Sequence, residues 1–464
     1  MTPSFRNSKN LGSSVNLPYF NAISQQSDFT FNPRFFSDSK FLLQTEYRKL
    51  YKNSSHIVDA SLNNQKNIIN KGTSTHFFLK SNFELDKLFL DDEILKLKIQ
   101  KTSNDEYIDK YSIHSTSFLV ENKNILENSI EYSASKDDLD FDFSFFAYET
   151  LYKKNSDRYE FVYPNYTISK NFYPTNFFFD NLNLISSGNQ KKYSTNINEI
   201  ILINDFNFSS SNFENKLGLN QEINGIIKNV NSKGKNSEKL KDDKQVEILS
   251  LLSYDVNLPL IKETKFYKNI LIPQFSLRYS PNDSKNIKNS ERLLNSENIF
   301  SLNRIGFSET LETGTNLTIG LNFEKNSTID NKKILSSKIA TVFRKNSDEN
   351  LPLTSTLNKK QSDIVGNLTF DPIEQISLNY DYSINNNLDH VNLHKIDNTI
   401  KINNFINKFT FYEENDILGN NSYYENTSSL IIDNNNSFSF KTRENKKDNL
   451  TEFYNLIYEY KNDC

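Results

Sequence analysis

The sequence predicts an all-β fold made of long antiparallel strands, and two observations support this prediction. Apolar and polar residues alternate at every second position in many segments, most regularly between Leu368 and Ile384. Successive side chains of a strand point to opposite faces, so each such segment has one apolar and one polar face. Clusters of Asn, Asp, Ser and Lys separate these segments and are typical of turns.

The alternation recurs along the chain, and no change in composition or pattern marks a boundary between domains. In each case the apolar residues share one parity, and polar residues fill most of the other. The apolar members are Leu95, Leu97 and Ile99; Phe275, Leu277 and Tyr279; Leu317, Ile319, Leu321 and Phe323; and Leu368, Phe370, Ile376, Leu378, Tyr380, Tyr382 and Ile384. A single large β architecture over residues 1–464 is therefore the simplest interpretation.

The apolar face can turn inward, as in a soluble sandwich, or outward to lipid, as in a transmembrane barrel. Mean hydropathy is -0.65 and no apolar run reaches the roughly 18 residues of a spanning helix, which excludes helical spans. A barrel keeps mean hydropathy low, and the 37 Phe and 24 Tyr suit its lipid face and aromatic girdles. We therefore expect a large antiparallel transmembrane β-barrel with roughly 18 to 22 strands.

Connections and helices are predicted from the polar tracts and the apolar period. Residues 229–244 and 280–296 are expected to be extended loops. No long segment has a 3.6-residue apolar period with caps, so helices should be few and short. Asn-rich disorder is the alternative, but it does not require parity to persist over seven positions.

Charge and motifs argue against several functions. A net charge of -4 with scattered Lys and Arg leaves no basic patch for nucleic acid. His390 and His394 have i, i+4 spacing, which forms a metal face only on a helix, and a loop is expected there. There is no serine-hydrolase elbow, phosphate loop or zinc-protease motif. We expect no catalytic residues, no metal site and no cofactor.

The chain ends suggest a fragment of an exported protein. No apolar core of a signal peptide follows Arg6 and Lys9. Cys464, the only cysteine, directly follows a strand-like run. An odd cysteine in an exported protein is a candidate for a disulfide to a segment outside this chain. Its simpler interpretation is a free thiol at a strand end.

Several segments resemble the barrel of the LPS-assembly protein LptD family, of the alphaproteobacterial kind. Their order is more specific than any one of them. They are Leu17–Asn21 with Asp28–Thr30 and Pro33; Glu46–Arg48; Leu277–Pro281; Ile299–Arg304 with Glu312 and Gly314; and Leu450–Asn455 with Tyr460–Cys464. Between about residues 52 and 255 the resemblance is limited to the alternating pattern and the general composition. Asp28, Glu46, Arg48, Asn303, Arg304 and Glu312 are the residues that match the family signature most directly.

The resemblance implies a 26-stranded outer-membrane barrel that receives lipopolysaccharide from the periplasm and releases it sideways into the outer leaflet. It also implies an LptE-type lipoprotein that plugs the lumen and an LptA bridge that docks on an N-terminal jelly-roll domain. This chain is expected to be a partial barrel that lacks the jelly roll and the final strands. Cys464 lies where the family carries cysteines that bond to the N-terminal domain.

The same resemblance places Pro18 and Pro33 in the first two barrel strands, beside a lateral gate. Proline has no amide to donate, so each one removes a ladder hydrogen bond. Prolines that merely mark strand starts are the alternative. At the level of the whole chain, a porin or substrate-specific channel, or a soluble β-rich adhesin, also remains open.

Overall fold

The computed structural model describes residues 3–8, 11–37, 41–64, 73–86, 90–153, 157–174, 178–193 and 195–460. Within them the fold is all-β, with 27 strands in one sheet. The described helices are the four-residue α1 (Tyr107–Lys110) and the 3-10 turns η1 (Ile113–Ser115), η3 (Leu353–Ser355) and η4 (Asp416–Leu418). None of the described helices has the length and apolar character needed to cross a membrane. The expectation of few, short helices is confirmed.

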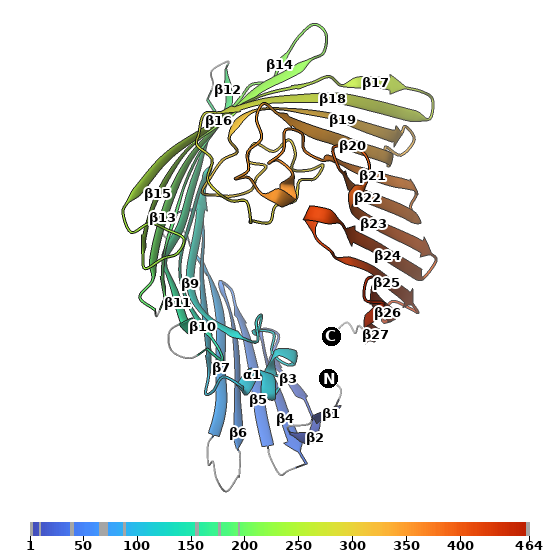
Figure 1. Cartoon of the computed structure of the whole chain (residues 1–464). Coiled ribbons are helices and arrows are strands. Elements are labelled where there is room, and N and C mark those ends of the chain that lie inside the picture. The colour runs from blue at the N-terminus through green and yellow to red at the C-terminus, as the bar shows by residue number, and fades with distance from the viewer. Residues whose placement is uncertain are drawn as a thin grey trace. The chain divides into compact units, whose positions relative to one another are not determined.

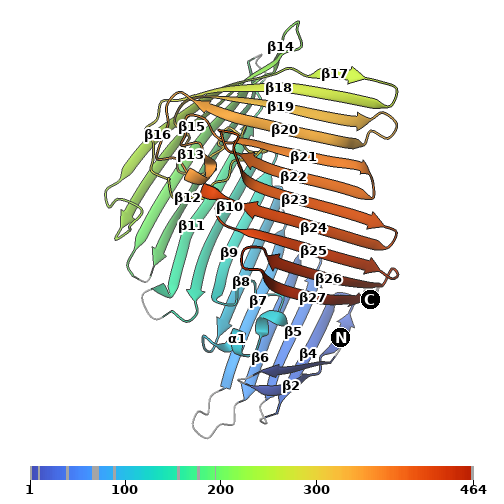
Figure 2. The same ribbon diagram turned by 45° about the vertical axis from the view of Figure 1, so that its right-hand side comes forward.

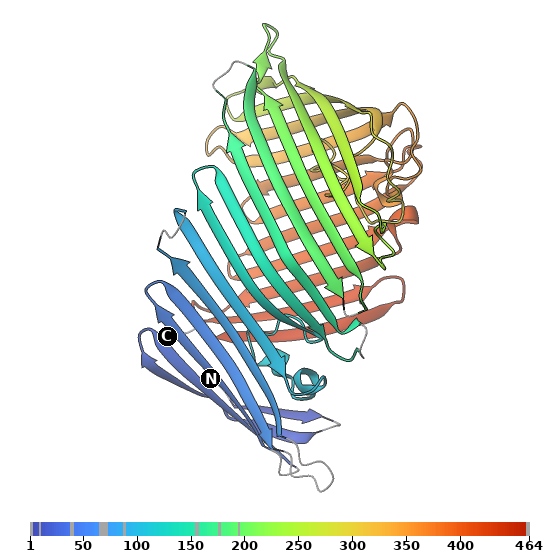
Figure 3. The ribbon, with the colours of Figure 1, turned by 90° about the vertical axis from the view of Figure 1, so that its left-hand side faces the viewer.

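The chain divides into two compact units, which we describe separately. Strands β1 to β11 lie wholly in the first unit, where neighbouring strands such as β9, β10 and β11 pair antiparallel, side by side (Figure 3). Their bounds are β1 Ser4–Ser8, β2 Gly12–Asn16, β3 Tyr19–Ser24, β4 Ser27–Phe36, β5 Phe41–Tyr51, β6 Ser54–Asn64, β7 Thr73–Leu85, β8 Asp92–Thr102, β9 Ile125–Lys136, β10 Leu139–Thr150 and β11 Tyr159–Phe172.

The second unit holds β14 and β17 to β27, and Figure 2 shows β18 to β27 as an antiparallel meander. Four long strands belong in part to each unit: β12 Phe179–Tyr193, β13 Asn198–Ser210, β15 Asn220–Lys235 and β16 Gln245–Asn257. The others are β14 Phe213–Glu214, β17 Leu260–Glu263, β18 Tyr267–Ser280, β19 Gly314–Ser327, β20 Lys333–Arg344, β21 Ile364–Ile373, β22 Ile376–Ile384, β23 Val391–Ile402, β24 Phe405–Glu414, β25 Ser422–Ile431, β26 Asn436–Asn445 and β27 Leu450–Tyr460.

The strand count exceeds the expected 18 to 22 because some strands are too short to span a bilayer. Five of the 27, namely β1, β2, β3, β14 and β17, have six residues or fewer. The remaining 22 have nine residues or more, close to the length that a tilted membrane strand needs. The number expected for a barrel of this chain length therefore agrees with the long strands and leaves out the short ones.

Asn and Asp form many of the tight turns between these strands. Asp137, Asn331, Asn403 and Asn449 all have positive φ in connections between consecutive strands. Asn and Asp tolerate this left-handed region better than other non-glycine residues because their short side chains bond to the local backbone. A chain with 11 Gly can thus still build many hairpins.

The sheet buries its polar face and exposes its apolar face. On β18, Phe275, Leu277 and Tyr279 keep 45%, 49% and 55% of their surface exposed. The intervening Ser276, Arg278 and Ser280 keep 0%, 1% and 3%. A protein dissolved in water would bury the first set, so this polarity is that of a wall with lipid outside. The sandwich alternative predicted the opposite.

The segment between Leu368 and Ile384 is two strands rather than the single run that the alternation suggested. β21 and β22 form a hairpin in which Leu368 pairs with Tyr380 and Phe370 with Leu378. Even-numbered residues pair with each other as far as Phe370 and Leu378, so both strands carry their apolar residues on the same parity, and the register shifts by one at the turn, where Ile373 pairs with Ile376. On the other face Asn367 donates to Asn379 and Asp381 at 2.8 and 2.7 Å.

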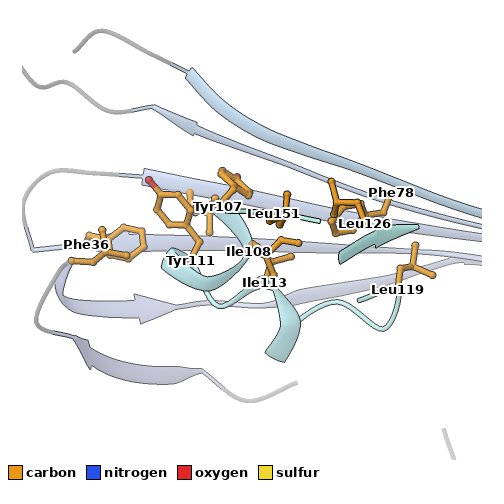
Figure 4. Close-up of a cluster of buried hydrophobic side chains, with 11 residues drawn as sticks. Phe36, Phe78, Tyr107, Ile108, Tyr111, Ile113, Leu119, Leu126 and Leu151 are labelled. Carbon is orange, nitrogen blue, oxygen red and sulfur yellow. The ribbon is translucent and has the colours of Figure 1, made fainter. Parts of the chain in front are cut away.

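Two apolar clusters lie on the polar face, each beneath segments that connect strands. In the first unit, α1 and η1 contribute Tyr107, Ile108, Tyr111 and Ile113, which pack with Phe36 and Phe78 of the sheet (Figure 4). In the second, the loops 281–313 and 345–363 fold onto β18 to β21 (Figure 1) and bury Leu294, Ile299, Leu351 and Leu357 against Val342. These clusters give each unit an apolar core inside its polar face.

The two predicted loops have different outcomes. Residues 281–296 do belong to a connection, which continues to 313. Residues 229–235 instead form the end of β15, so the prediction of a loop from 229 was wrong by seven residues. Val230 and Ile226 of this strand are buried, and this burial outweighs the polar composition of the segment.

An arginine scan of β22 tests which face meets lipid. An arginine on the lipid face near the bilayer midplane costs about 2–4 kcal/mol, whereas one on the wet face costs little. Leu378→Arg should therefore reduce assembly into outer membranes far more than Ser377→Arg. The folded fraction can be read as heat-modifiable protein on gels, and equal tolerance of both variants would contradict this orientation.

Candidate functional site

Strands β2 and β3 form one strand that is interrupted at Leu17 and Pro18. β2 pairs with β4 through Ser14 and Phe36, and β3 pairs with β4 through Tyr19 and Phe31, in the same register. The register with β4 is the same before and after residues 17 and 18, so neither strand has an inserted residue. The interruption is therefore a local loss of backbone hydrogen bonds within one continuous strand pairing.

Pro33 causes part of this loss. The Leu17 amide donates to the Pro33 carbonyl at 3.0 Å. In an antiparallel ladder such a pair normally exchanges two bonds, and the second requires an amide on Pro33. Pro18, the next residue, faces the opposite side of its strand, on which β1 pairs with β2. Pro33 of β4 thus removes a bond on one side of the strand formed by β2 and β3, and Pro18 removes a donor on its other side.

A second copy of this arrangement lies in the other unit, and sequence analysis missed it. The tetrapeptide Val15–Pro18 recurs as Val256–Pro259, and Pro259 separates β16 from β17. The Leu258 amide donates to the Pro273 carbonyl of β18 at 3.1 Å, as Leu17 does to Pro33. The register with β18 is again unchanged across the gap. The repeated four-residue string was the signal that could have revealed it.

The polar face of β4 and β5 holds the first predicted signature residues. Asp28 and Arg48 are cross-strand partners, and the Arg48 Nε donates to Asp28 at 2.8 Å. Glu46 lies 3.4 Å from the same Nε atom. The structure thus brings these three residues together. Arg48 is partly exposed, so its ion pairs contribute only about 0–1 kcal/mol to stability.

A buried polar network attaches α1 to this face. The Ser61 hydroxyl lies 2.5 Å from His76 Nδ1 and 2.6 Å from the Tyr107 hydroxyl, and His76 Nε2 lies 3.1 Å from Asp59. Burial raises the pKa of Tyr107, which keeps its hydroxyl protonated and able to donate. The order of serine, histidine and carboxylate resembles a hydrolase triad. However, Ser61 is buried beneath Tyr107, so the network positions a loop and assigns no catalytic role.

The other signature residues lie in the loop 281–313 of the second unit. Arg304 donates twice to Glu312, at 2.6 and 2.7 Å, and both residues are buried. Arg344 of β20 donates to the same carboxylate at 2.5 Å. Arg304 also donates to Thr318 and Asn316 of β19 at 2.7 and 2.9 Å. One carboxylate thus ties the loop to two strands.

Asn303 and Arg278 support the same loop. The Asn303 side chain donates to the Phe307 carbonyl at 3.0 Å, which closes a turn within the loop. Arg278 of β18 donates to the Phe300 carbonyl at 2.7 Å. From the sequence, Arg278 is identified only as part of the Leu277–Pro281 segment that resembles the family, without a role of its own. Its partner is a loop carbonyl, which an alternating pattern does not identify.

The ionisation of Glu312 follows from its surroundings. Burial opposes the charged form, but the charge and hydrogen bonds of Arg304, with the charge of Arg344, outweigh it and hold the pKa of Glu312 below 4.5. A lowered folded-state pKa stabilises the fold at neutral pH, and this stability is lost as the pH falls through the lowered value.

The structure supports no chemical role for two features considered from the sequence, Cys464 and the pair His390 and His394. Cys464 lies outside the described residues. His390 lies in the connection before β23 and His394 on β23 itself, where i, i+4 spacing does not form a helical metal face. In the part of the chain that the structure describes, no group of His, Cys, Asp or Glu is arranged to hold a metal ion.

Glu312→Gln tests the buried cluster. It leaves two buried guanidinium groups without their carboxylate, and breaking a buried ion pair costs about 3–5 kcal/mol. The loop 281–313 should become sensitive to added protease at neutral pH. Glu309→Gln is the matched control, because its pair with Lys285 at 3.2 Å is exposed and contributes little. In the unmodified protein, protection should be lost only as the pH falls through the pKa of Glu312, which Arg304 and Arg344 hold below the usual range of a glutamate. Equal protection of both variants would show that the cluster does not hold the loop.

Two outer-membrane receptors are among the solved structures to which the chain is similar. The FauA alcaligin outer-membrane receptor of Bordetella pertussis is 6% identical, with 95% of this chain and 72% of that chain covered and a TM-score of 0.35. The BauA ferric preacinetobactin receptor of Acinetobacter baumannii is 7% identical, with coverage of 97% and 76% and a TM-score of 0.29. No curated protein matches the sequence.

The family comparison is more informative. A family described as LPS transport system D, LptD, matches residues 72–442. This range covers most of the 464 residues and includes the loop 281–313 with its Arg304 and Glu312 cluster. The chain is therefore an outer-membrane β-barrel protein that belongs to the LptD family of the lipopolysaccharide transport system.

Proposed function

We propose that this chain forms the wall through which lipopolysaccharide leaves the barrel and enters the outer leaflet, and that the wall opens along β2, β3 and β4. The observation that carries the proposal is the Leu17–Pro33 pair, which keeps one ladder bond and lacks the other. Membership of the LptD family supports lipopolysaccharide as the transported molecule.

The cargo explains why an opening in the wall is useful. Lipopolysaccharide has a sugar part that prefers water and acyl chains that prefer lipid. On β4 the polar face carries Asp28, Asn32 and Arg34, and the other carries Phe31 and Phe35. An opening at this strand would let the two parts of the lipid move along surfaces of matching polarity at the same time.

The prolines lower the cost of such an opening. In lipid a separated strand cannot replace its lost backbone bonds with water, so each bond resists opening. Pro33 removes a donor on the side of Leu17, and Pro18 removes one on the outer side. Among the described residues, β3 pairs only with β4, so its other side is where a partner strand can bind and leave.

We extend the proposal to the partners that the family resemblance implies. An LptE-type lipoprotein would occupy the lumen, and an LptA bridge would deliver the lipid through a jelly-roll domain joined to this barrel. The cargo meets the wall from the polar side in this scheme. The segment with α1 and η1 in the first unit, and the loops 281–313 and 345–363 in the second, cover part of the polar face.

Pro33→Ala combined with Pro18→Ala tests the gate. The backbone amides restored at residues 18 and 33 should stabilise the pairing of the strands by about 1 kcal/mol for each hydrogen bond. The fraction of barrels with an open wall should then fall roughly fivefold for each bond. Lipopolysaccharide at the cell surface should fall and sensitivity to detergent should rise, at normal barrel levels.

Pro259→Ala combined with Pro273→Ala is the matched control, since it restores the same bonds in the second copy of the motif. We expect it to leave export unchanged. If the Pro18 and Pro33 variant and the Pro259 and Pro273 variant reduce export equally, the prolines affect the flexibility of the whole barrel. If the Pro18 and Pro33 variant exports lipopolysaccharide normally, the wall does not open between β2, β3 and β4.

Cys464 supplies a separate test. In the complete mature protein it should form a disulfide with a cysteine beyond residues 1–464, because the export compartment is oxidising. Peptide mapping without reductant would detect the linked fragment. Rapid alkylation of Cys464 in native membranes would instead identify a free thiol.

A further inference from the structure

We propose that Arg6 and Arg34 form a binding site for an anionic group, a phosphate monoester or a carboxylate, carried on a sugar. The two guanidinium groups line a cavity of about 850 Å³ on the polar face of β1, β2 and β4. This volume lies within the range of ordinary small-molecule sites. The assignment to the transported lipid rests on the function proposed above, whereas the anion site itself does not.

Strand pairing places both arginines on the same face. Arg6 of β1 pairs with Ser14 of β2, which pairs in turn with Phe36 of β4. Arg34 lies two residues before Phe36 on β4 and therefore shares its face. Ser14 and Phe36 line the same cavity, so the sheet supplies one continuous wall of it.

Neither arginine is neutralised within the described residues. Arg34 keeps 6% of its surface exposed, and one of its donors is used by the Tyr111 carbonyl at 2.6 Å. No ion pair of Arg6 or Arg34 occurs in the described part of the chain, in contrast to Arg48, which is bound to Asp28. A buried guanidinium with free donors is costly unless an anion binds it.

The opposite wall favours a ligand that also has a sugar or apolar part. α1 contributes Asp109 and Lys110 to the cavity, and Glu106 directly precedes this helix. Asp109 is 3.2 Å from Lys123, which offsets its charge. Tyr152 adds an aromatic ring beside them. Arginine binds phosphate and carboxylate in a two-pronged geometry, so the sheet wall selects the anion, and the α1 wall contacts the rest of the ligand.

The position of this site gives it a role in transport. Arg34 directly follows Pro33, the residue that interrupts the ladder, and pairs with Asn16 just before Leu17. An anion bound here would hold the charged sugar of the lipid beside the seam while the acyl chains meet the lipid face. The site would then concentrate cargo at the opening rather than open it.

Binding to the complete protein, purified in detergent, tests the inference with three probes. They are a bisphosphorylated glucosamine-disaccharide lipid, the same lipid after phosphatase treatment, and inorganic phosphate. The intact protein should prefer the phosphorylated lipid. Arg6→Gln with Arg34→Gln should weaken its binding about tenfold, which corresponds to about 1.4 kcal/mol, and should leave the dephosphorylated lipid unaffected.

Further variants separate binding from folding. Arg6 is exposed, so Arg6→Gln alone should preserve the fold and still lose part of the affinity. Arg34→Lys keeps the charge but not the two-pronged geometry, so it should bind more tightly than Arg34→Gln and less tightly than the intact protein. Arg443→Gln, outside the cavity and paired with Glu452 at 2.9 Å, should change nothing. Heat-modifiable mobility on gels confirms a folded barrel for each variant.

The outcomes distinguish the possible sources of the anion. Equal binding of both lipids by the intact protein, or no loss with the double variant, overturns the site. Inorganic phosphate that binds as tightly as the lipid would keep the anion site and overturn its assignment to lipid. Failure of the gate would appear instead as normal export in the Pro18 and Pro33 variants, so the two proposals fail independently.

Discussion

The structure depends on one constraint, which is that a strand facing lipid must satisfy its backbone amides within the sheet. The apolar face is then free to be exposed, and the polar face must be covered from inside. On β18 this arrangement leaves Leu277 exposed and buries Arg278, the reverse of a soluble protein. The long ladders, the segments folded over the polar face and the effect of the prolines all follow from it.

Arg304 and Glu312 show how the polar face is covered. A loop of 33 residues between β18 and β19 would be costly to order through apolar contacts alone, since its composition is mostly polar. The bidentate pair and the Arg344 contact fix its base, and Ile299 and Ile305 then fill an apolar core above the sheet. In the other unit, Tyr107 has the same role through Ser61.

Sequence reasoning predicted the strands well because their signal is local. Alternation depends on neighbouring residues and is present on both strands of the β21–β22 hairpin, where even-numbered residues pair with each other as far as Phe370 and Leu378. It failed at residues 229–235, where burial of a polar strand depends on distant neighbours. Asp28 with Arg48, and Arg304 with Glu312, were identified by family resemblance; their contacts with each other, and the parts of Arg344 and Tyr107, arise from tertiary folding that spacing does not encode.

The two proline motifs show where local sequence stops determining function. Leu17 with Pro33 and Leu258 with Pro273 make the same single bond, so the same weakness exists at two places. The strands before the two breaks differ in their other neighbour. β2 pairs there with β1, which has only five residues, whereas β16 is bonded to the 16-residue β15 through Asn224 and Asp255 at 3.0 Å. A missing donor beside a long neighbouring strand softens the wall, whereas beside a short one it also affects how easily a strand leaves. In the proposed function, the edge on which Pro18 and Pro33 lie would therefore determine where the wall opens, and the prolines would adjust how easily it does so.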